Sequence, residues 1–266
     1  MPDDNYQLFC KRIHQLIGLD LALYKDKQMK RRIGTYMTRL GVSNYLELAN
    51  LLSKDEEALN SFKEFLTINV SEFFRNPEQF EILKTKIMPE IIRPNSRFRV
   101  WSAGCSDGCE PYTLVIILEE LGIKNYEILA TDFDVGILAR AKTGAYKIDS
   151  LRNVSPILLN KYFLKGEGDI YQFNPKLAMQ VKFLHHDLLS GKYEKNLDLI
   201  LCRNVVIYFT EEAKNQVFMK MSQALRQDGV LFVGGTESIL APKKFGFQTI
   251  YPFFYKKVSN LEATML

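Results

Sequence analysis

The sequence lacks several features that would have placed the protein in another class. No apolar run approaches the roughly 18 residues that a membrane-spanning helix needs. The first five residues have neither the basic start nor the apolar core of a secretory signal. Only four cysteines occur, at positions 10, 105, 109 and 202, and none forms a CxxC pair. We therefore expect a reduced, cytoplasmic protein that does not insert into a membrane.

The sequence also lacks internal repeats, low-complexity tracts and a strong excess of charge. The formal net charge is +4 and the pI about 8.7, too weak alone to indicate nucleic-acid binding. Hydrophobic residues make up 47% of the chain, which supports a substantial core. A length of 266 residues suits one large domain or two modest ones. Nothing in the composition requires an oligomer, and we expect a monomer.

The centre of the sequence is a strand, a glycine-bracketed turn and a helix within residues 98–112, FRVWSAGCSDGCEPY. Residues 99–102 predict a buried strand because Val and Trp favour β structure. Pro111 fits the first turn of a helix, and apolar residues at helical spacing follow it. In doubly wound α/β folds a nucleotide-type ligand binds at such a turn, where glycine lets the backbone come close. We therefore expect Gly104 to contact the ligand.

Two carboxylates indicate which ligand this turn accepts. The phosphate-binding patterns GxGxxG and GxxxxGK[ST] are both missing. Asp132 ends a predicted strand over 126–131, where an acid can accept both hydroxyls of a ribose. Glu110, just past the turn, suits a cationic cofactor better than a pyrophosphate. S-adenosylmethionine carries a sulfonium and an ammonium and has no phosphate. The alternative, an ordinary tight turn with a surface acid, is disfavoured by Asp132.

The N-terminal part of the chain, residues 1 to about 66, predicts only helices. Its apolar residues recur at helical spacing in four segments, the second of which ends at Gly41. Lys25, Arg32 and Arg39 are seven residues apart on that second helix and form one basic stripe. Such a stripe suits docking on an acidic helix or coiled coil, although a solvated helix face is the simpler alternative. Nucleic acid is disfavoured because no aromatic residues are interleaved.

A polar segment, residues 67–77 (TINVSEFFRNP), joins the helical part to the central strand. Its Asn-Pro end predicts a capped helix that runs to residue 87. Asn69, Ser71 and Arg75 surround two phenylalanines, Phe73 and Phe74. This arrangement predicts a pocket lid with polar groups and aromatic walls. The alternative is a linker that carries two core phenylalanines.

Downstream of the centre, the sequence alternates between strands and helices. Residues 197–202 predict a buried strand with Arg203 and Asn204 at its carboxyl end. Since the carboxyl ends of parallel strands share one edge, we expect both residues beside Gly104 and Asp132. The alternation predicts an α/β fold with a doubly wound, mostly parallel sheet.

A small β insertion is predicted beside this sheet at about 150–184, because short strand-like pieces flank a glycine-containing turn. These pieces occupy 162–165, 170–173 and 179–184. Residues 248–256 predict one closing strand. The adjacent His185 and His186 would point to opposite faces of a strand and have no evident third partner, so we expect no metal site.

Five stretches together carry a family resemblance. They are TINVSEFFR at 67–75, RVWSAGCSDGCEPY at 99–112, ATDFD at 130–134, CRNVVIYF at 202–209 and GVLFVGGTES at 229–238. In this order they resemble the CheR-type chemotaxis receptor methyltransferases over nearly the whole chain. The resemblance implies a Rossmann-like class I methyltransferase fold. It also implies a receptor-docking helical domain at 1–68, a linker and cofactor lid helix at 69–95, and a methyltransferase domain at 96–266 that contains the β insertion.

The resemblance implies methyl transfer from S-adenosylmethionine to glutamate side chains on the cytoplasmic helices of chemoreceptors, which leaves S-adenosylhomocysteine. The implied cofactor-binding residues are Asn69, Ser71, Arg75, Gly104, Glu110, Asp132, Asp187, Leu188, Arg203 and Asn204. Arg75 and Tyr208 would lie nearest the reacting groups, and Tyr208 would add a further wall to the pocket. Lys25, Arg32 and Arg39 would meet the acidic receptor helix.

The sequence departs from the family pattern at a few site positions. Asp107 and Cys109 replace Thr and Glu in the glycine turn, Asp187 replaces Asn, and Ser71 replaces Thr. The changes at Asp107, Cys109 and Asp187 keep open a methyltransferase-like module that lacks catalysis and only docks on receptors or binds a signalling ligand. A dinucleotide-dependent oxidoreductase is a further alternative, disfavoured because Glu110 would face the pyrophosphate.

Overall fold

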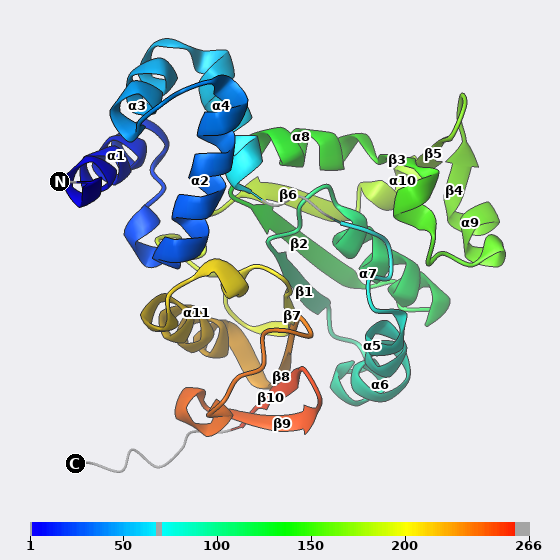
Figure 1. Cartoon of the computed structure of the whole chain (residues 1–266). Coiled ribbons are helices and arrows are strands. Elements are labelled where there is room, and N and C mark those ends of the chain that lie inside the picture. Colours follow the sequence, from blue (N-terminus) through cyan, green and yellow to red (C-terminus); the bar gives the residue numbers. More distant parts are fainter. Residues whose placement is uncertain (1, 68–70, 259–266) are drawn as a thin grey trace, which may run out of the picture. The chain divides into compact units, whose positions relative to one another are not determined.

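The computed structural model describes residues 2–67 and 71–258, which form two compact units (Figure 1). The helical unit comprises Met1–Ile68 and Val206–Gln216, and the sheet unit comprises Asn69–Val205 and Val217–Leu266. Within the described residues, no helix is both long and apolar enough to cross a membrane.

The helical unit is built from the amphipathic segments that the sequence predicts. Its helices are α1 (Pro2–Ile17), α2 (Asp26–Leu40), α3 (Tyr45–Lys54) and α4 (Glu56–Leu66). Side-chain caps begin two of them, since Asn44 accepts from the N–H of Glu47 and Asp55 from the N–H of Ala58. Gly41, with φ of 68°, ends α2 in the left-handed conformation that glycine tolerates best. The prediction of an all-helical N-terminal part is confirmed.

A segment distant in sequence, residues 206–216, completes the helical unit. Tyr24 and Phe209 form an antiparallel bridge, and their rings meet edge to face with centroids 5.1 Å apart. The N–H of Lys25 donates to the carbonyl of Tyr208 at 2.8 Å. Helix α11 (Glu211–Ala224) begins in this segment. The sequence did not predict this pairing.

The sheet unit contains a seven-stranded sheet in the order β6-β2-β1-β7-β8-β10-β9. Its strands are β1 (Phe98–Ala103), β2 (Tyr126–Asp132), β6 (Val181–His185), β7 (Leu197–Cys202), β8 (Leu225–Val233), β9 (Phe247–Tyr251) and β10 (Phe254–Lys257). The first five of these pair in parallel, and β10 is antiparallel to both of its neighbours. This arrangement confirms the predicted α/β class with a mostly parallel sheet.

The strand order places a topological switch point at β1. The chain runs from β1 through β2 to β6 on one side and then returns to β7 and β8 on the other. Because β2 and β7 both pair in parallel with β1, the turns that follow these three strands emerge at one edge. Ligands of open α/β sheets bind at such an edge.

Short helices bury apolar side chains against one face of this sheet. They are α5 (Pro77–Ile82), α6 (Met88–Ile91), α7 (Cys109–Glu120) and α8 (Val135–Thr143), with a π-helical turn, Leu83–Ile87, between α5 and α6. On the opposite face, Trp101 is 1% exposed and packs edge to face against His186 and Tyr193. The central strands are therefore buried on both faces, as expected for a doubly wound sheet.

A second sheet, in the order β3-β5-β4, forms the predicted insertion (Figure 1). Its elements are β3 (Ala145–Lys147), β4 (Phe163–Lys165), β5 (Ile170–Phe173) and the short helices α9 (Pro156–Tyr162) and α10 (Pro175–Ala178). The strand expected at 179–184 does not belong to it, because β6 pairs in parallel with β2 in the main sheet. The single closing strand expected at 248–256 is also wrong, since Phe253, with φ of 71°, lies in a turn between β9 and β10.

Candidate functional site

The glycine turn after β1 is packed tightly between its neighbours. The N–H groups of Gly104 and Cys105 both donate to the carbonyl of Thr131 on β2, at 2.8 and 2.9 Å. Gly104 and Gly108 have φ values of 77° and 89°, which favour glycine. A Cβ on Gly104 would lie 2.4 Å from a methyl carbon of Val205. Gly104 is therefore required by its backbone conformation and by the close approach of the turn after β7.

Asp132 lies at the carboxyl end of β2, beside the glycine turn, and is 9% exposed. Its two carboxylate oxygens accept from the N–H groups of Ser106, at 2.9 Å, and Asp134, at 3.0 Å. Burial raises the pKa of Asp132, and these N–H donors oppose that shift. Each oxygen keeps a further lone pair, so this acid can still accept from the hydroxyls of a ribose.

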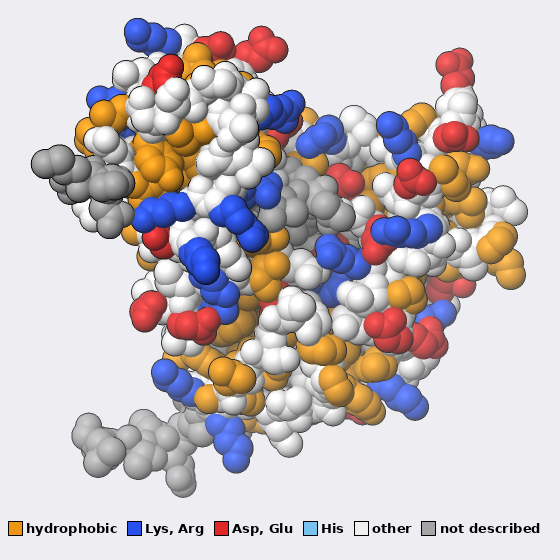
Figure 2. Space-filling view, viewed as in Figure 1, with side chains coloured by type: hydrophobic (Ala, Val, Ile, Leu, Met, Phe, Trp, Pro, Cys, Tyr) orange, Lys and Arg blue, Asp and Glu red, His pale blue; other side chains and the backbone are white. Residues whose placement is uncertain are grey.

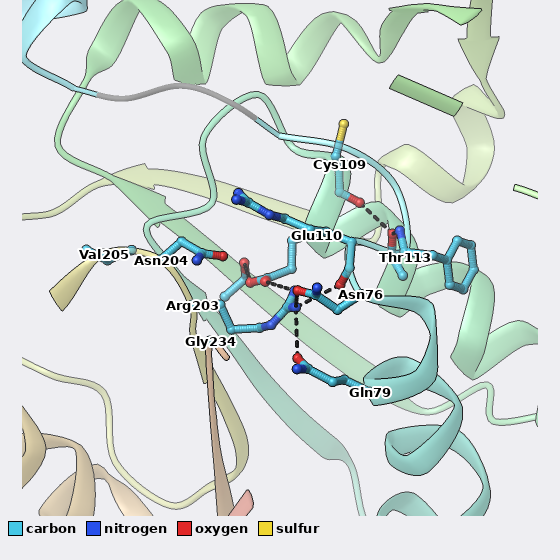
Figure 3. Close-up of polar contacts among 12 residues, drawn as sticks. Asn76, Gln79, Cys109, Glu110, Thr113, Arg203, Asn204, Val205 and Gly234 are labelled. Carbon is cyan, nitrogen blue, oxygen red and sulfur yellow. Dashed lines mark hydrogen bonds and ion pairs between the residues drawn. The ribbon is translucent and has the colours of Figure 1, made fainter. Parts of the chain in front are cut away.

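Glu110, in the first turn of α7, pairs with Arg203 at the same edge (Figure 3). Its carboxylate accepts from the hydroxyl of Ser102 at 2.7 Å and lies 3.4 Å from the Arg203 guanidinium. The side chains of Glu110 and Arg203 are 14% and 3% exposed. Burial raises the pKa of Glu110, and Arg203 opposes that shift. Burial lowers the pKa of Arg203, which Glu110 opposes in turn.

Arg203 also joins the end of β7 to the predicted lid segment (Figure 3). Its Nη2 donates to the carbonyl of Arg75 at 2.7 Å, to Oδ1 of Asn76 at 3.1 Å and to Oε1 of Gln79 at 3.2 Å. Asn76 was expected to cap α5, but its side chain makes no capping bond and its φ is 61°. The amide oxygen accepts from a charged donor instead, which gives a stronger hydrogen bond than a neutral backbone N–H.

The loop after β6 carries Asp187 and Leu188. It begins beside Asp132, because the N–H of His186 donates to the Asp132 carbonyl at 2.9 Å. The Asp187 carboxylate accepts from the N–H of Leu189 at 2.8 Å and from a serine hydroxyl at 2.7 Å. Leu188 is buried at 7% exposure. The Asp187 carboxylate thus stabilises its own loop, and its contact with an adenine stays a prediction.

The lid segment is anchored by its backbone and by one phenylalanine. The N–H of Phe73 donates to the Ser150 carbonyl at 2.9 Å, and the N–H of Phe74 donates to the Thr113 hydroxyl at 3.1 Å. Phe73 is fully buried among the rings of the insertion. The prediction of Phe73 as a pocket wall is therefore wrong, and this residue fits the alternative of a core phenylalanine.

The positions of the other predicted lid residues do not test their proposed contacts with the cofactor. Ser71 and Arg75 are half-buried in the sheet unit, and Asn69 lies outside the described residues. The cofactor contacts expected of these three residues stay predictions.

Tyr208 and the basic stripe belong to the helical unit. The joint action of Tyr208 with Arg75 therefore stays a prediction. Figure 2 shows Lys and Arg side chains gathered over α2. Arg39 is exposed, but the guanidinium of Arg32 donates to the carbonyl of Phe65 and lies 4.7 Å from the centre of that ring. The Arg32 guanidinium is thus engaged with Phe65 within the helical unit, so the three residues of the stripe do not present equivalent charges to a partner.

The sequence analysis did not single out Gln79 or Glu237. Gln79 is 7% exposed and accepts from Arg203, and Glu237 is 5% exposed and accepts from three backbone N–H groups. Glu237 lies within GVLFVGGTES, one of the quoted motifs, and its position beside two glycines was the only available signal. Nothing in the sequence distinguishes Gln79 from a surface residue of α5.

The chemistry of this edge fits S-adenosylmethionine. Two carboxylates, half-buried Glu110 and buried Asp132, flank a turn whose glycine conformations leave little room for side chains. Within the described residues, the buried Nε of Arg203 has no hydrogen-bond partner, and no cluster of acids, histidines and cysteines could hold a metal ion. A cationic ligand without phosphate suits this set of side chains.

Comparison with known proteins gives consistent matches along the chain. A model of the CheR methyltransferase SAM-binding domain matches residues 69–252, and a model of the CheR all-alpha domain matches residues 4–67. A chemotaxis protein methyltransferase of Listeria monocytogenes is 42% identical over 261 residues, which covers 97% of this chain and 99% of the relative. Relatives with the same name occur in Borreliella burgdorferi, at 32% identity over 96% of this chain and 94% of the relative, and in Escherichia coli, at 30% over 90% and 85%.

Proposed function

The chain belongs to the CheR methyltransferase family, and we propose that it methylates glutamate side-chain carboxylates on the cytoplasmic helices of chemoreceptors. Its cofactor is S-adenosylmethionine, which supplies a methyl group on a positively charged sulfur. The products are a glutamate methyl ester and S-adenosylhomocysteine. The observation that carries the proposal is the pair of carboxylates, half-buried Glu110 and buried Asp132, beside the glycine turn of a chain that matches this SAM-binding domain.

Each carboxylate has a proposed role in holding the cofactor. Glu110 binds the ammonium of the methionine part, and Asp132 accepts from the ribose hydroxyls. Arg203 opposes the rise that burial causes in the pKa of Glu110, because the guanidinium lies 3.4 Å from the carboxylate. Ser71, Asp187, Leu188 and Asn204 complete the proposed cofactor site, together with Asn69 and the backbone of Gly104.

The proposed chemistry needs alignment and no general base. A glutamate carboxylate is already ionised at neutral pH, so no proton has to be removed before it attacks. The rate then depends on holding the carboxylate in line with the methyl group and on excluding water. Arg75 is proposed to orient the incoming carboxylate through charge-assisted hydrogen bonds, and Tyr208 to lie beside the reacting groups.

The unusual residues of the glycine turn support retained function and disfavour a silent binding module. Cys109 is fully buried, so it replaces the usual glutamate as a core residue of α7. Asp107 accepts from the N–H of Cys109 at 3.3 Å and so helps to begin that helix. Neither substitution removes Glu110 or Asp132 from the edge of the sheet. The protein is proposed to act in the cytoplasm as a monomer that docks on its receptor through α2.

The test uses S-adenosylmethionine with a labelled methyl group and membranes that contain chemoreceptors. We expect base-labile label, released as methanol, with the wild-type protein. Arg75→Ala should lose most of this activity while staying folded, and Arg140→Ala, an exposed arginine on α8, should keep it. Tight cofactor binding without label on any receptor would favour the silent module. Equal activity of the two variants would remove Arg75 from its proposed role.

A further inference from the structure

One buried carboxylate, that of Glu237, holds the turn that follows β7. The N–H of Val205 donates to its Oε1 at 2.8 Å, and the N–H groups of Asn204 and Gly234 donate to its Oε2, the latter at 2.9 Å. Glu237 is only 5% exposed. Three backbone donors from the loops after β7 and β8 therefore meet at a single side chain.

The backbone of the loops after β7 and β8 packs closely around the Glu237 carboxylate. Asn204 has a φ of 61°, a left-handed conformation that asparagine adopts more readily than most residues other than glycine. A Cβ on Gly234 would lie 2.4 Å from Oε2 of Glu237 and 2.9 Å from the nitrogen of Asn204. The glycine at 234 thus leaves the space that the Glu237 carboxylate occupies. Without this acceptor, the partly buried N–H groups of Asn204 and Val205 and the buried N–H of Gly234 would lose a hydrogen-bond partner.

The turn that Glu237 fixes carries the side chain at the centre of the site. Arg203 immediately precedes it and contacts Glu110, the Arg75 carbonyl and Asn76 at the same time. A planar guanidinium makes such contacts only from a narrow range of backbone positions. A shift of the turn would therefore weaken the contact with Glu110 and the contacts with the lid segment together.

We propose that Glu237 is a positioning residue for cofactor binding, which acts by fixing the turn at residues 203–205 so that Arg203 joins Glu110 to the lid segment. The inference rests on the proposed function, in which Arg203 and Asn204 face S-adenosylmethionine. It gives Glu237 no contact with the cofactor. It acts mainly through the backbone of the turn, and its negative charge also favours the ionised form of Arg203.

The test measures binding of S-adenosylhomocysteine to the full chain by calorimetry. Glu237→Gln has nearly the same shape but replaces one acceptor oxygen with an amide NH2, which faces backbone donors. We expect affinity to fall about tenfold or more, because only the fraction of molecules with the turn and Arg203 correctly placed can bind tightly. Glu90→Gln, an exposed glutamate on α6, should bind as tightly as the wild type.

A double-mutant cycle separates positioning from a general loss of stability. Arg203→Lys keeps the charge beside Glu110 but cannot reach the lid segment at the same time. If Glu237 acts through Arg203, the double variant binds no more weakly than Arg203→Lys alone. If the losses of affinity in the two single variants multiply fully in the double variant, the inference is overturned, because Glu237 would then affect binding independently of Arg203. If Glu237→Gln does not fold, Gly234→Ala takes its place in this cycle, because its new methyl group would displace the Glu237 carboxylate.

The outcomes also separate this inference from the proposed function. A wild-type protein that does not bind S-adenosylhomocysteine would overturn both. Wild-type binding that is weakened by Arg203→Lys but unchanged in Glu237→Gln would overturn only the positioning role. The positioning role is supported if each single variant binds more weakly than the wild type and their losses do not multiply in the double variant.

Discussion

Gly104 is the residue at which the glycine turn and the turn after β7 meet. Its φ of 77° is unfavourable for other residues, and the side chain of Val205 occupies the place of a Cβ. Gly122 has a similar φ of 71° but no atom within 4 Å of that place. Alanine at Gly122 would therefore meet only the free-energy cost of a left-handed backbone, whereas alanine at Gly104 would also clash with Val205.

We expect Gly104→Ala to reduce both stability and affinity for S-adenosylhomocysteine much more than Gly122→Ala. The Gly122 change should cost about 1 kcal/mol, the usual penalty for a left-handed alanine. Urea unfolding and calorimetry measure the two quantities. The double variant Gly104→Ala/Val205→Ala should recover most of the difference, because the clashing methyl groups are gone. Equal losses in the two single variants would show that packing against Val205 is unimportant.

Among the structural elements, the β insertion has direct contacts with the proposed cofactor site. Tyr146 on β3 donates its hydroxyl proton to the carbonyl of Asp107 in the glycine turn at 2.8 Å. Phe73 of the lid segment packs edge to face on Tyr146 and Phe163, with centroids 4.8 and 5.1 Å away. The insertion therefore supports the glycine turn and the lid segment from one side, and its aromatic core should contribute to both.

Phe73→Ala should lower the free energy of unfolding by about 3–5 kcal/mol, the usual range for a buried phenylalanine. The matched control is Leu164→Ala on β4, whose side chain is 61% exposed and should contribute little. Chemical denaturation followed by tryptophan fluorescence reports the values, since Trp101 lies in the central strand of the same unit. A small loss for Phe73→Ala would mean that the lid segment is not anchored through this ring.

At the scale of the whole molecule, the proposed docking residues of α2 and the proposed cofactor-binding residues belong to different units. The helical unit carries the basic residues of α2 and also Tyr208, whose carbonyl accepts from the N–H of Lys25. The sheet unit carries Arg75, Glu110 and the rest of the proposed cofactor site. The substitution of a docking residue should therefore change recognition of the receptor and leave cofactor binding intact.

Arg39→Glu tests this separation, because Arg39 is the exposed member of the stripe. We expect the KM for receptor to rise about three- to tenfold, with unchanged affinity for S-adenosylhomocysteine. The effect should shrink in high salt, which screens exposed charges. Lys142→Glu makes the same charge change on α8 of the sheet unit and should leave this KM near the wild-type value. Equal effects of both variants would indicate a response to net charge alone.

The sequence by itself determined most of the elements, their order and the family. These features depend on local patterns: apolar periodicity in α1 to α4, the glycines around the turn after β1, and the acid at the end of β2. Asp132 and Glu110 were found because each directly adjoins such a pattern. The sequence also predicted that Arg203 follows a buried strand of the parallel sheet, which the structure confirms; the role of Arg203 in cofactor binding stays a prediction.

Only the tertiary structure decided which side chains meet across long separations in sequence. Arg203 donates hydrogen bonds to Asn76 and Gln79, which lie more than a hundred residues earlier in the sequence. Glu237 accepts from the backbone of a turn about thirty residues before it. The same is true of β6, whose pattern suited the insertion but which pairs with β2. A hydrogen bond between distant residues leaves no periodic trace in the sequence, because it depends on how the strands are ordered in the sheet.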